Sequence, residues 1–205
     1  MIAVGEEVRV APIVPVSELR DYRRINAELS RLLDEGHPRV RLEGVEGQRL
    51  LLTGLAGGWD AVVELDGSAG PELAAGLNAP GLLVVCQGDA ADGAGSGLFG
   101  GRVLIAGDTG AVVGYAQRGG VVVVAGSAGP RAGLNQSGGT LVLLGPAGRL
   151  AGERQSGGTL FVRAEGVGPH ASRDRRGGRL VAGDAHEDGE YRAAVSGLGP
   201  WIEGL

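Results

Sequence analysis

Short apolar segments recur along the chain at an almost constant distance from one another. Segments 102–106, 121–125, 140–144 and 159–163 are rich in valine and leucine, and a pair of glycines precedes each of them. Segments of this length and composition predict β-strands that are buried in a parallel sheet. The glycine pairs follow one another at steps of 19, 19, 19 and 20 residues, at Gly100-Gly101, Gly119-Gly120, Gly138-Gly139, Gly157-Gly158 and Gly177-Gly178. An internal repeat of this length indicates a solenoid in which each repeat forms one coil.

Further glycines keep the same spacing inside each repeat and predict the corners of the coil. Glycine tolerates positive φ, so a column of glycines is expected wherever every coil must bend in that way. Three straight sides joined by three corners make one turn of an all-β parallel solenoid, whose core is closed by stacked neighbours. We expect about seven coils between residues 40 and 183. The expected corners are Gly101, Gly107, Gly110, Gly114, Gly120, Gly126, Gly129, Gly133, Gly139, Gly145, Gly148, Gly152 and Gly158.

An amphipathic helix over residues 17–35 is predicted to cover the first coil, because an open solenoid end exposes unpaired strand edges. Ser17 is the expected N-cap, Gly36 ends the helix and Pro38 prevents its resumption. The apolar residues that recur at helical spacing are Leu19, Tyr22, Ile25, Leu29, Leu32 and Leu33.

The tail, residues 184–205, is expected to fold over the last coil as a second cap. Its apolar residues are Tyr191, Val195, Leu198, Trp201, Ile202 and Leu205. The chain thus divides into an N-terminal segment with the capping helix (1–38), the solenoid (39–183) and this tail.

Alternation along each strand separates an inner from an outer face. Positions two and four after each glycine pair should point into the coil: Val103 and Ile105, Val122 and Val124, Leu141 and Leu143, Leu160 and Val162. Position three should point outward, yet it is apolar in every repeat: Leu104, Val123, Val142, Phe161 and Val181. An apolar stripe on an outer wall predicts a subunit interface, at which Val142→Glu or Phe161→Glu should abolish association and leave the fold intact. The alternative is that the N-terminal segment or the tail covers the wall within the chain.

A column of glutamines shares the period of the repeat. Gln117, Gln136 and Gln155 lie one coil apart, so their amides can hydrogen-bond to one another, as in the amide ladders of cross-β structures. We expect a structural ladder, with contact to a ligand as the alternative.

Composition and charge narrow the class of protein. Glycine accounts for 41 of 205 residues, but the valine runs exclude the collagen period, and 43% hydrophobic residues with a net charge of −5 argue against disorder. The negative charge also argues against a nucleic-acid partner. Neither a signal peptide nor a membrane span of about 20 apolar residues is recognisable, and the single cysteine, Cys86, excludes an intrachain disulfide. We expect a cytoplasmic protein without contact to a membrane.

The residues suited to catalysis or metal binding do not form a recognisable site. Cys86 lies in an apolar run and should be a buried, inert thiol. His37, His170 and His186 are scattered, and the acidic stretch 184–188 resembles a solvated loop more than a metal site. Calcium-binding β-rolls need aspartates that recur in each turn, and we do not expect such recurrence for Asp89, Asp92 and Asp108. We therefore expect no catalytic, cofactor-binding or metal-binding residue.

An arginine cluster near the end of the repeats could bind an acidic partner. It consists of Arg173, Arg175, Arg176 and Arg179. The nearby acidic residues Asp184, Glu187, Asp188 and Glu190 are expected to cancel most of its charge.

Several stretches together resemble the carboxy-terminal β-helix domain of the glutamate synthase large subunit, in the form in which that domain is a separate polypeptide. They are Arg24–Leu29, Gly44–Arg49, Gly88–Gly95, Gly100–Gly110 and Val113–Gly120. The resemblance covers roughly residues 20–160. Similar coils occur in a subunit of formylmethanofuran dehydrogenase and in a subunit of N-methylglutamate synthase. The glutamine column departs from the family pattern, which is mainly apolar there, and residues 165–205 fall outside the match.

The resemblance implies a right-handed β-helix without catalytic residues. In that family the domain supports a glutaminase part and a synthase part, and the FMN and iron–sulfur clusters belong to the latter. It therefore implies a structural subunit that binds no cofactor itself and contacts the other subunits of a glutamate-synthase-like complex, a further copy of itself, or both. Two alternatives stay open: a subunit of the formylmethanofuran dehydrogenase type, and a self-associating solenoid with a ligand of its own.

Overall fold

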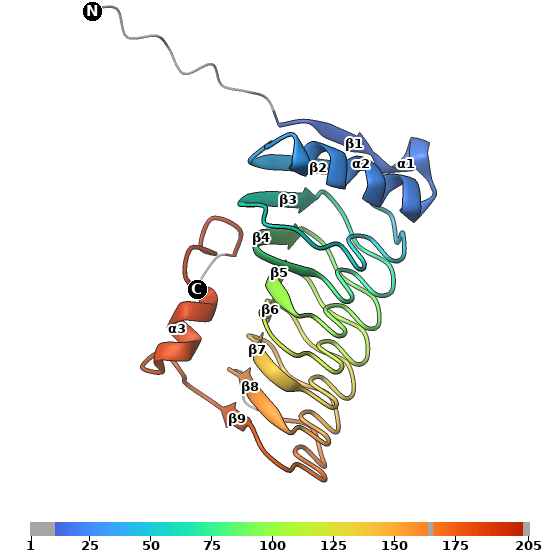
Figure 1. The fold of residues 1–205 in the computed structure, drawn as a ribbon. Coiled ribbons are helices and arrows are strands. Elements are labelled where there is room, and N and C mark those ends of the chain that lie inside the picture. The colour runs from blue at the N-terminus through green and yellow to red at the C-terminus, as the bar shows by residue number, and fades with distance from the viewer. Residues whose placement is uncertain (1–10, 164–165, 203–205) are drawn as a thin grey trace, which may run out of the picture.

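The computed structural model describes residues 11–163 and 166–202 and confirms the predicted parallel β-solenoid of about seven turns. One sheet contains nine strands, which follow one another in chain order and pair in parallel throughout (Figure 1). The strands are β1 (Ile13–Pro15), β2 (Arg39–Glu43), β3 (Ala61–Leu65), β4 (Asn78–Cys86), β5 (Gly100–Ile105), β6 (Val121–Val124), β7 (Ser137–Leu143), β8 (Gly157–Val162) and β9 (Arg179–Ala182).

Equivalent positions of successive coils lie directly beside one another. Val121 pairs with Thr140, and Thr140 with Thr159, so each position forms a column along the solenoid. The predicted inner positions, from Val103 to Val162, are buried and belong to one core. The apolar position between them belongs to a second cluster on the opposite face of the sheet, as the alternation predicts.

A turn that faces away from the sheet carries the most unusual backbone of the molecule. In each coil three alternate residues have positive φ, for example Val112 (56°), Gly114 (67°) and Ala116 (51°). A left-handed residue with a side chain costs about 1–2 kcal/mol, and hydrogen bonds between coils offset this cost. The backbone N–H of Val112 donates to the carbonyl of Pro130 at 2.9 Å. The repeat pattern did not predict that residues other than glycine would be left-handed here.

The expected reason for the corner glycines holds for only part of them. Positive φ is found at Gly101, Gly114, Gly120, Gly133, Gly139, Gly152 and Gly158. The other predicted corners, Gly107, Gly110, Gly126, Gly129, Gly145 and Gly148, do not have positive φ. They are glycines because the coils touch there: a Cβ on Gly129 would lie 2.7 Å from the carbonyl carbon and oxygen of Gly110. The explanation by positive φ is therefore wrong for these columns.

The predicted helix covers the first coil, but it begins later than expected. The chain forms α1 (Val16–Leu19) and then α2 (Tyr22–Asp34). Ser17 lies inside α1, and the N-cap of α2 is Asp21, whose side chain accepts a hydrogen bond from the backbone N–H of Arg23 at 3.0 Å. The buried residues of α2 are Ile25, Asn26, Leu29, Leu32 and Leu33. The helix ends next to Gly36, as predicted, where φ is +80°.

Asn26 attaches this helix to the backbone of the first coil. Its Nδ2 donates to the carbonyl of Leu50 at 3.0 Å, and its Oδ1 accepts from the N–H of Leu52 at 2.9 Å. Both Leu50 and Leu52 are left-handed residues of the first turn. The amide thus pairs the N–H of Leu52, which in later coils a preceding coil pairs, and adds a second hydrogen bond to the carbonyl of Leu50, which also accepts from the N–H of Thr53 at 3.3 Å. Within the described part of the chain, no helix is both long and apolar enough to span a bilayer.

Candidate interaction surface

The C-terminal segment, which we define as residues 184–202, covers the apolar outer wall. Its helix α3 (Gly189–Val195) lies beside the strands rather than over the last coil (Figure 1). The segment buries Tyr191, Ala194, Leu198 and Ile202 against Leu104, Val123, Val142 and Phe161. The rings of Phe161 and Tyr191 meet edge to face, with centroids 5.6 Å apart.

This arrangement corrects two expectations. The wall residues Leu104, Val123, Val142 and Phe161 are at most 1% exposed, so they are not a free subunit interface, and only Val181 of that column is partly exposed. The alternative, that the tail covers the wall within the chain, is what the structure shows. The tail is also not a cap of the last coil. The physical reason is area: a stripe along several strands buries more apolar surface than the edge of one coil.

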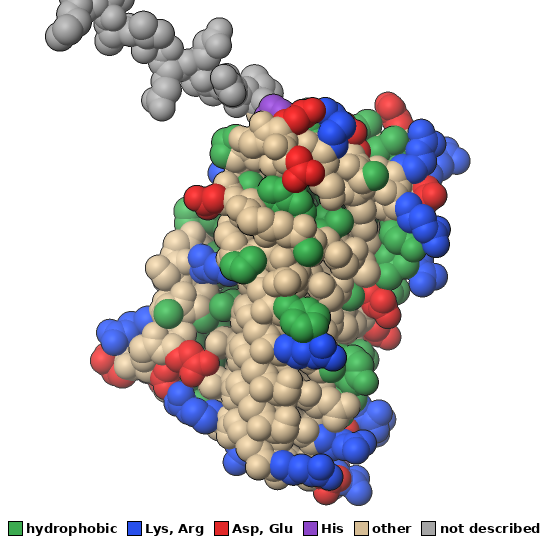
Figure 2. Space-filling view, in the orientation of Figure 1, with side chains coloured by type: hydrophobic (Ala, Val, Ile, Leu, Met, Phe, Trp, Pro, Cys, Tyr) green, Lys and Arg blue, Asp and Glu red, His purple; other side chains and the backbone are tan. Residues whose placement is uncertain are grey.

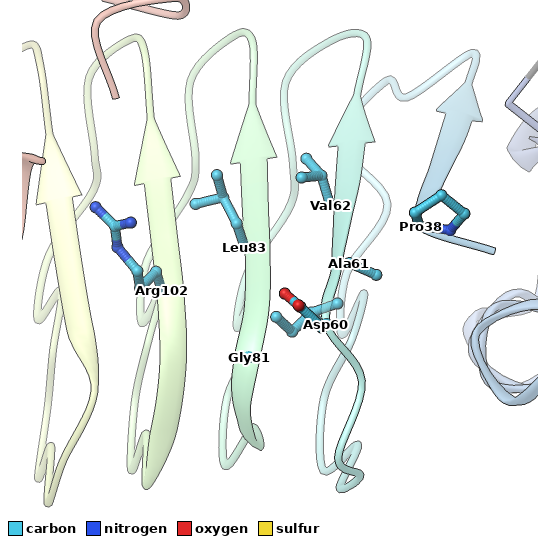
Figure 3. A pocket seen from close by; sticks show the side chains of 8 residues that line it. Pro38, Asp60, Ala61, Val62, Gly81, Leu83 and Arg102 are labelled. Atoms are coloured by element: carbon cyan, nitrogen blue, oxygen red, sulfur yellow. The ribbon is translucent and has the colours of Figure 1, made fainter. Parts of the chain in front are cut away.

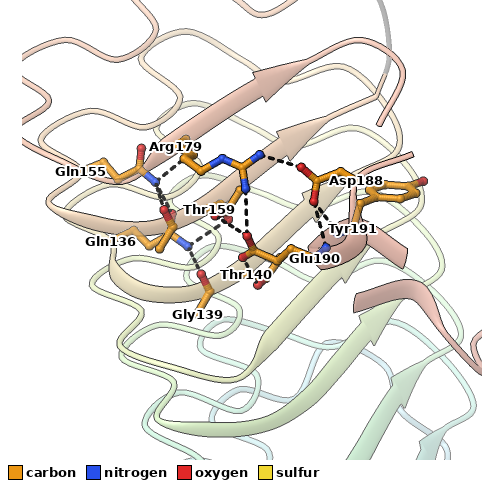
Figure 4. Close-up of polar contacts among 10 residues, drawn as sticks. Gln136, Gly139, Thr140, Gln155, Thr159, Arg179, Asp188, Glu190 and Tyr191 are labelled. Carbon is orange, nitrogen blue, oxygen red and sulfur yellow. Dashed lines mark hydrogen bonds and ion pairs between the residues drawn. The ribbon is translucent and has the colours of Figure 1, made fainter. Parts of the chain in front are cut away.

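Polar side chains that directly follow the glycine pairs hold the C-terminal segment in place (Figure 4). They are Thr140, Thr159 and Arg179. The carboxylate of Glu190 accepts hydrogen bonds from the hydroxyls of Thr140 and Thr159, at 2.8 and 2.9 Å. Arg179 donates to Asp188 at 2.6 Å and to Glu190 at 3.3 Å. The hydrogen bond from Arg179 lowers the pKa of Asp188, and burial opposes this shift.

Arg102 contacts the far end of α3. Its Nη2 donates to the backbone carbonyl of Ala194 at 3.0 Å and to that of Ser196 at 2.6 Å. These carbonyls lie at the C-terminal end of the helix, where a cation is favoured. Partial burial lowers the pKa of this guanidinium.

The C-terminal segment does not cover the outer wall over β2–β4, which carries charged as well as apolar side chains. Ion pairs join Arg39 to Glu64 at 3.3 Å and Arg41 to Asp66 at 3.8 Å across neighbouring strands. Next to them an open groove of about 430 Å³ has Val62 and Leu83 in its lining (Figure 3). The remainder of its lining is Pro38, Asp60, Ala61, Gly81, Leu82 and Arg102. Among the described residues, this mixed wall is a part of the outer sheet that the C-terminal segment leaves uncovered.

The glutamine ladder lies inside the coil and is confirmed (Figure 4). Gln117, Gln136 and Gln155 are fully buried. Two hydrogen bonds join the column: Nε2 of Gln136 donates to Oε1 of Gln117 at 3.3 Å, and Nε2 of Gln155 donates to Oε1 of Gln136 at 3.0 Å. Because none of the three side chains reaches solvent, the alternative of ligand contact does not hold. The ladder ends at Gln155, whose Oε1 accepts no hydrogen bond.

The candidate chemical residues are not brought together. Cys86 is buried, its Sγ donates to the carbonyl of Gly67 at 3.3 Å, and burial raises the pKa of its thiol. His37 and His186 lie beside acidic neighbours of their own loops, at 3.7 Å from Glu35 and 3.9 Å from Asp184. Among residues 11–163 and 166–202, no group of three His, Cys, Asp or Glu residues could hold a metal ion.

Two aspartates recur at the period of the coil, contrary to expectation. The Oδ1 of Asp89 accepts a hydrogen bond from the N–H of Asp108 at 2.8 Å, and that of Asp108 accepts from the N–H of Ser127 at 2.6 Å. The 19-residue spacing of Asp89 and Asp108 was the signal that could have predicted this contact. These carboxylates bind the backbone of the next coil and act as structural links between corners.

Comparison with models of protein families, with curated proteins and with solved structures finds no match to this chain.

Proposed function

We propose that this chain is a non-catalytic structural subunit of a glutamate-synthase-like complex, which holds a glutaminase-type subunit and a flavin and iron–sulfur synthase subunit in a fixed relation. The observation that carries the proposal is the position of the residues that resemble that family's β-helix domain. In the stretch Gly88–Gly95, Asp89 links two coils through its carboxylate, and Cys86 just before it is buried. In the helix Arg24–Leu29, Asn26 attaches the cover to the first coil.

The solenoid suits a supporting role. Each coil contacts only its neighbours, and every coil is tied to the next by backbone and side-chain hydrogen bonds, which limits bending. The open outer wall over β2–β4, with its alternating arginines and carboxylates, offers a polar contact surface of fixed shape. In this proposal FMN and the iron–sulfur clusters belong to the partners.

Affinity purification of the tagged full chain from its source cell, followed by mass spectrometry, tests the proposal. Recovery of a glutaminase-type and a flavin synthase-type protein in fixed ratio is the expected result. Recovery of molybdopterin or formyltransferase proteins would replace it with the formylmethanofuran dehydrogenase alternative. A chain that recovers only itself would reject both and leave a self-associating solenoid.

A second measurement addresses the absence of chemistry in this subunit. The purified chain is expected to show no flavin absorbance and no stoichiometric iron or zinc in a metal assay. A bound cofactor at one equivalent would contradict the structural role.

A further inference from the structure

The two ends of the solenoid differ in how they are covered. Helix α2 packs over the first coil, whereas no described residue covers the free edge of the last coil, residues 166–183, with which a further coil would pair (Figure 1). Leu180 continues the inner column of Leu141 and Leu160, yet it is only partly buried. An uncovered solenoid end exposes backbone groups that a further coil would otherwise pair.

The register of the coils shows which backbone groups these are. Arg131 and Leu150 occupy the same left-handed position in successive coils. The N–H of Arg131 donates to the carbonyl of Arg149 in the following coil at 2.8 Å, and the N–H of Leu150 donates to that of Pro169 at 2.9 Å. His170, with φ of 62°, is the next residue in this column. Its N–H therefore points out of the open end and meets no backbone acceptor in the described part of the chain.

A second donor and an acceptor lie beside it. The N–H of Arg154 donates to the carbonyl of Arg173 at 2.8 Å, and Asp174 continues that column with φ of 55°. The carbonyl of Ala151 accepts from the N–H of Ser172 at 2.7 Å, and Ala171 continues that column. This turn of the open end thus presents two N–H donors, of His170 and Asp174, and between them the carbonyl of Ala171 as an acceptor.

Arginines surround these groups. Arg154, Arg173, Arg175 and Arg176 line a concavity of about 490 Å³ together with Glu153 and Asp174. Figure 2 shows arginine side chains gathered at this lower end of the molecule. Glu153 is paired with Arg131 at 3.1 Å, and Asp174 lies 3.9 Å from Arg173. Among the described residues Arg154, Arg175 and Arg176 have no ion-pair partner.

Asp188 and Glu190 of the C-terminal segment do not neutralise this concavity, and no residue of the segment lines it. Asp188 and Glu190, which the sequence places near the arginine cluster, are bound to Arg179 and to threonine hydroxyls on the outer wall. Arg179 therefore belongs to the contacts of the C-terminal segment, whereas the other arginines of the cluster line the concavity. The concavity keeps a net positive charge, with four arginines against two carboxylates.

We propose that the open C-terminal end binds an acidic segment of a partner protein, which lies along the left-handed turn of the last coil, where the turn of a further coil would pair. Carbonyls of the segment accept hydrogen bonds from the N–H groups of His170 and Asp174, and one of its N–H groups donates to the carbonyl of Ala171. Its carboxylates pair with Arg154, Arg175 and Arg176. A free phosphate satisfies the donors alone and is repelled by the exposed carbonyl, whereas a peptide matches both kinds of group.

The opposite end of the same molecule shows what such a cover requires. There the side-chain amide of Asn26 supplies one acceptor and one donor to the left-handed residues of the first coil. The inference deepens the proposed function and rests on it, since it names a surface and a partner chemistry through which a structural subunit would hold another subunit.

The test uses the isotope-labelled full chain and a short synthetic peptide of alternating glutamate and valine. Binding is expected to shift the amide signals of His170 and Asp174, to slow their hydrogen exchange and to weaken as salt is added. The double variant Arg175→Ala/Arg176→Ala should weaken binding by about ten-fold or more, because hydrogen bonds to charged groups are lost. Both residues are exposed, so the fold should persist. Arg24→Ala, an exposed arginine on the cover helix, is the matched control and should bind normally.

Three results would overturn the inference. The first is equal binding by the double variant, or unshifted signals at His170 and Asp174. The second is that inorganic tripolyphosphate shifts these signals while the peptide does not. The third is a concentration-dependent dimer of the chain alone that the double variant abolishes, since the end would then bind a second copy. Recovery of partner enzymes without peptide binding would reject this inference and keep the proposed function, and peptide binding without such partners would do the reverse.

Discussion

Glycine occupies the corners of each coil for two different physical reasons. At Gly133 the backbone has φ of +69°, which a residue with a Cβ adopts only at a cost, while the nearest atoms to an added Cβ lie 3.6 Å away. At Gly129 φ is not positive, but an added Cβ would collide with the backbone of Gly110 in the preceding coil. The first constraint is local, whereas the second exists only because the coils stack.

Alanine substitution separates the two reasons. Gly133→Ala is expected to lower the free energy of unfolding by about 1–2 kcal/mol, the cost of a left-handed residue. Gly129→Ala should cost about 3 kcal/mol or more, because backbone cannot move aside as a side chain can. Urea denaturation measures both, with Gly199→Ala as a control, since an added Cβ there meets nothing within 4 Å. Equal losses at Gly129 and Gly133 would contradict this assignment.

The glutamine ladder is the second feature that depends on single residues. Gln136 accepts from Gln155 and donates to Gln117, and it also donates to the carbonyl of Gly139 at 3.2 Å. Leu98 occupies the same column one coil before Gln117 and is fully buried, so a leucine fits this position sterically.

Gln136→Leu therefore tests the contribution of the side-chain hydrogen bonds and not that of the side chain's shape. We expect a loss of about 2–4 kcal/mol in the free energy of unfolding, because buried partners on both sides lose their hydrogen bonds. Gln87→Leu, the same substitution at an exposed glutamine, should change little. A Gln136→Leu protein as stable as the parent in urea would show that the ladder contributes nothing net.

Among the elements, the C-terminal segment has the largest effect on which apolar residues the molecule exposes. It is a short helix with its flanking loops, and it covers an apolar wall that would otherwise be exposed. Apolar contacts through Tyr191 and polar contacts through Asp188 and Glu190 both attach it.

Phe161→Glu tests the apolar attachment. In an exposed wall this substitution would leave the fold intact, but Phe161 is fully buried against Tyr191. We expect a loss of about 3–5 kcal/mol in unfolding free energy and exposure of the segment to protease. Phe99→Glu, at a side chain that is 49% exposed, is the control and should be nearly neutral. Neutral behaviour of Phe161→Glu would restore the exposed-interface hypothesis.

Acid tests the polar attachment. Arg179 lowers the pKa of Asp188 in the folded chain, so the pair stabilises the segment above the ordinary carboxyl pKa, and this contribution is lost as the pH falls through the lowered value. The protection factors of the α3 amides, which correct for the intrinsic pH dependence of exchange, should therefore fall below about pH 4. Arg179→Ala should show fast exchange already at neutral pH and little further dependence in acid. The same acid response in both proteins would exclude this ion pair as its cause.

Taken end to end, the solenoid is asymmetric. Its first coil is covered by α2 and its last coil is open among the described residues. Solenoid stability is the sum of coil stabilities and contacts between neighbours, so a coil with one neighbour is less stable than a coil with two.

Hydrogen exchange along the chain measures this asymmetry. We expect the slowest exchange in β5–β7, and faster exchange in β9 than in β2. Asn26→Leu should raise exchange at Leu52 and reduce the difference between the ends, at a cost of about 1–3 kcal/mol, because the N–H of Leu52 loses its partner while the carbonyl of Leu50 keeps the N–H of Thr53. Ala27→Leu, exposed on the same helix, is the control. Equally slow exchange at both ends of the parent would contradict an open last coil.

Spacing along the chain was enough to predict the parallel solenoid, the stacking of Gln117 on Gln136, the inner and outer faces and the helix over the first coil. The reason is that a period of 19 residues brings equivalent positions of successive coils together. The spacing of two residues in the sequence is therefore enough to predict that they are in contact. The cover on the apolar wall became visible only in the folded molecule, since Arg102 and Ser196 meet across 94 residues and Ser196 lies outside the repeats. The folded molecule was also needed to explain why Gly129 must be glycine and which end stays open, because both depend on what lies on the neighbouring coil.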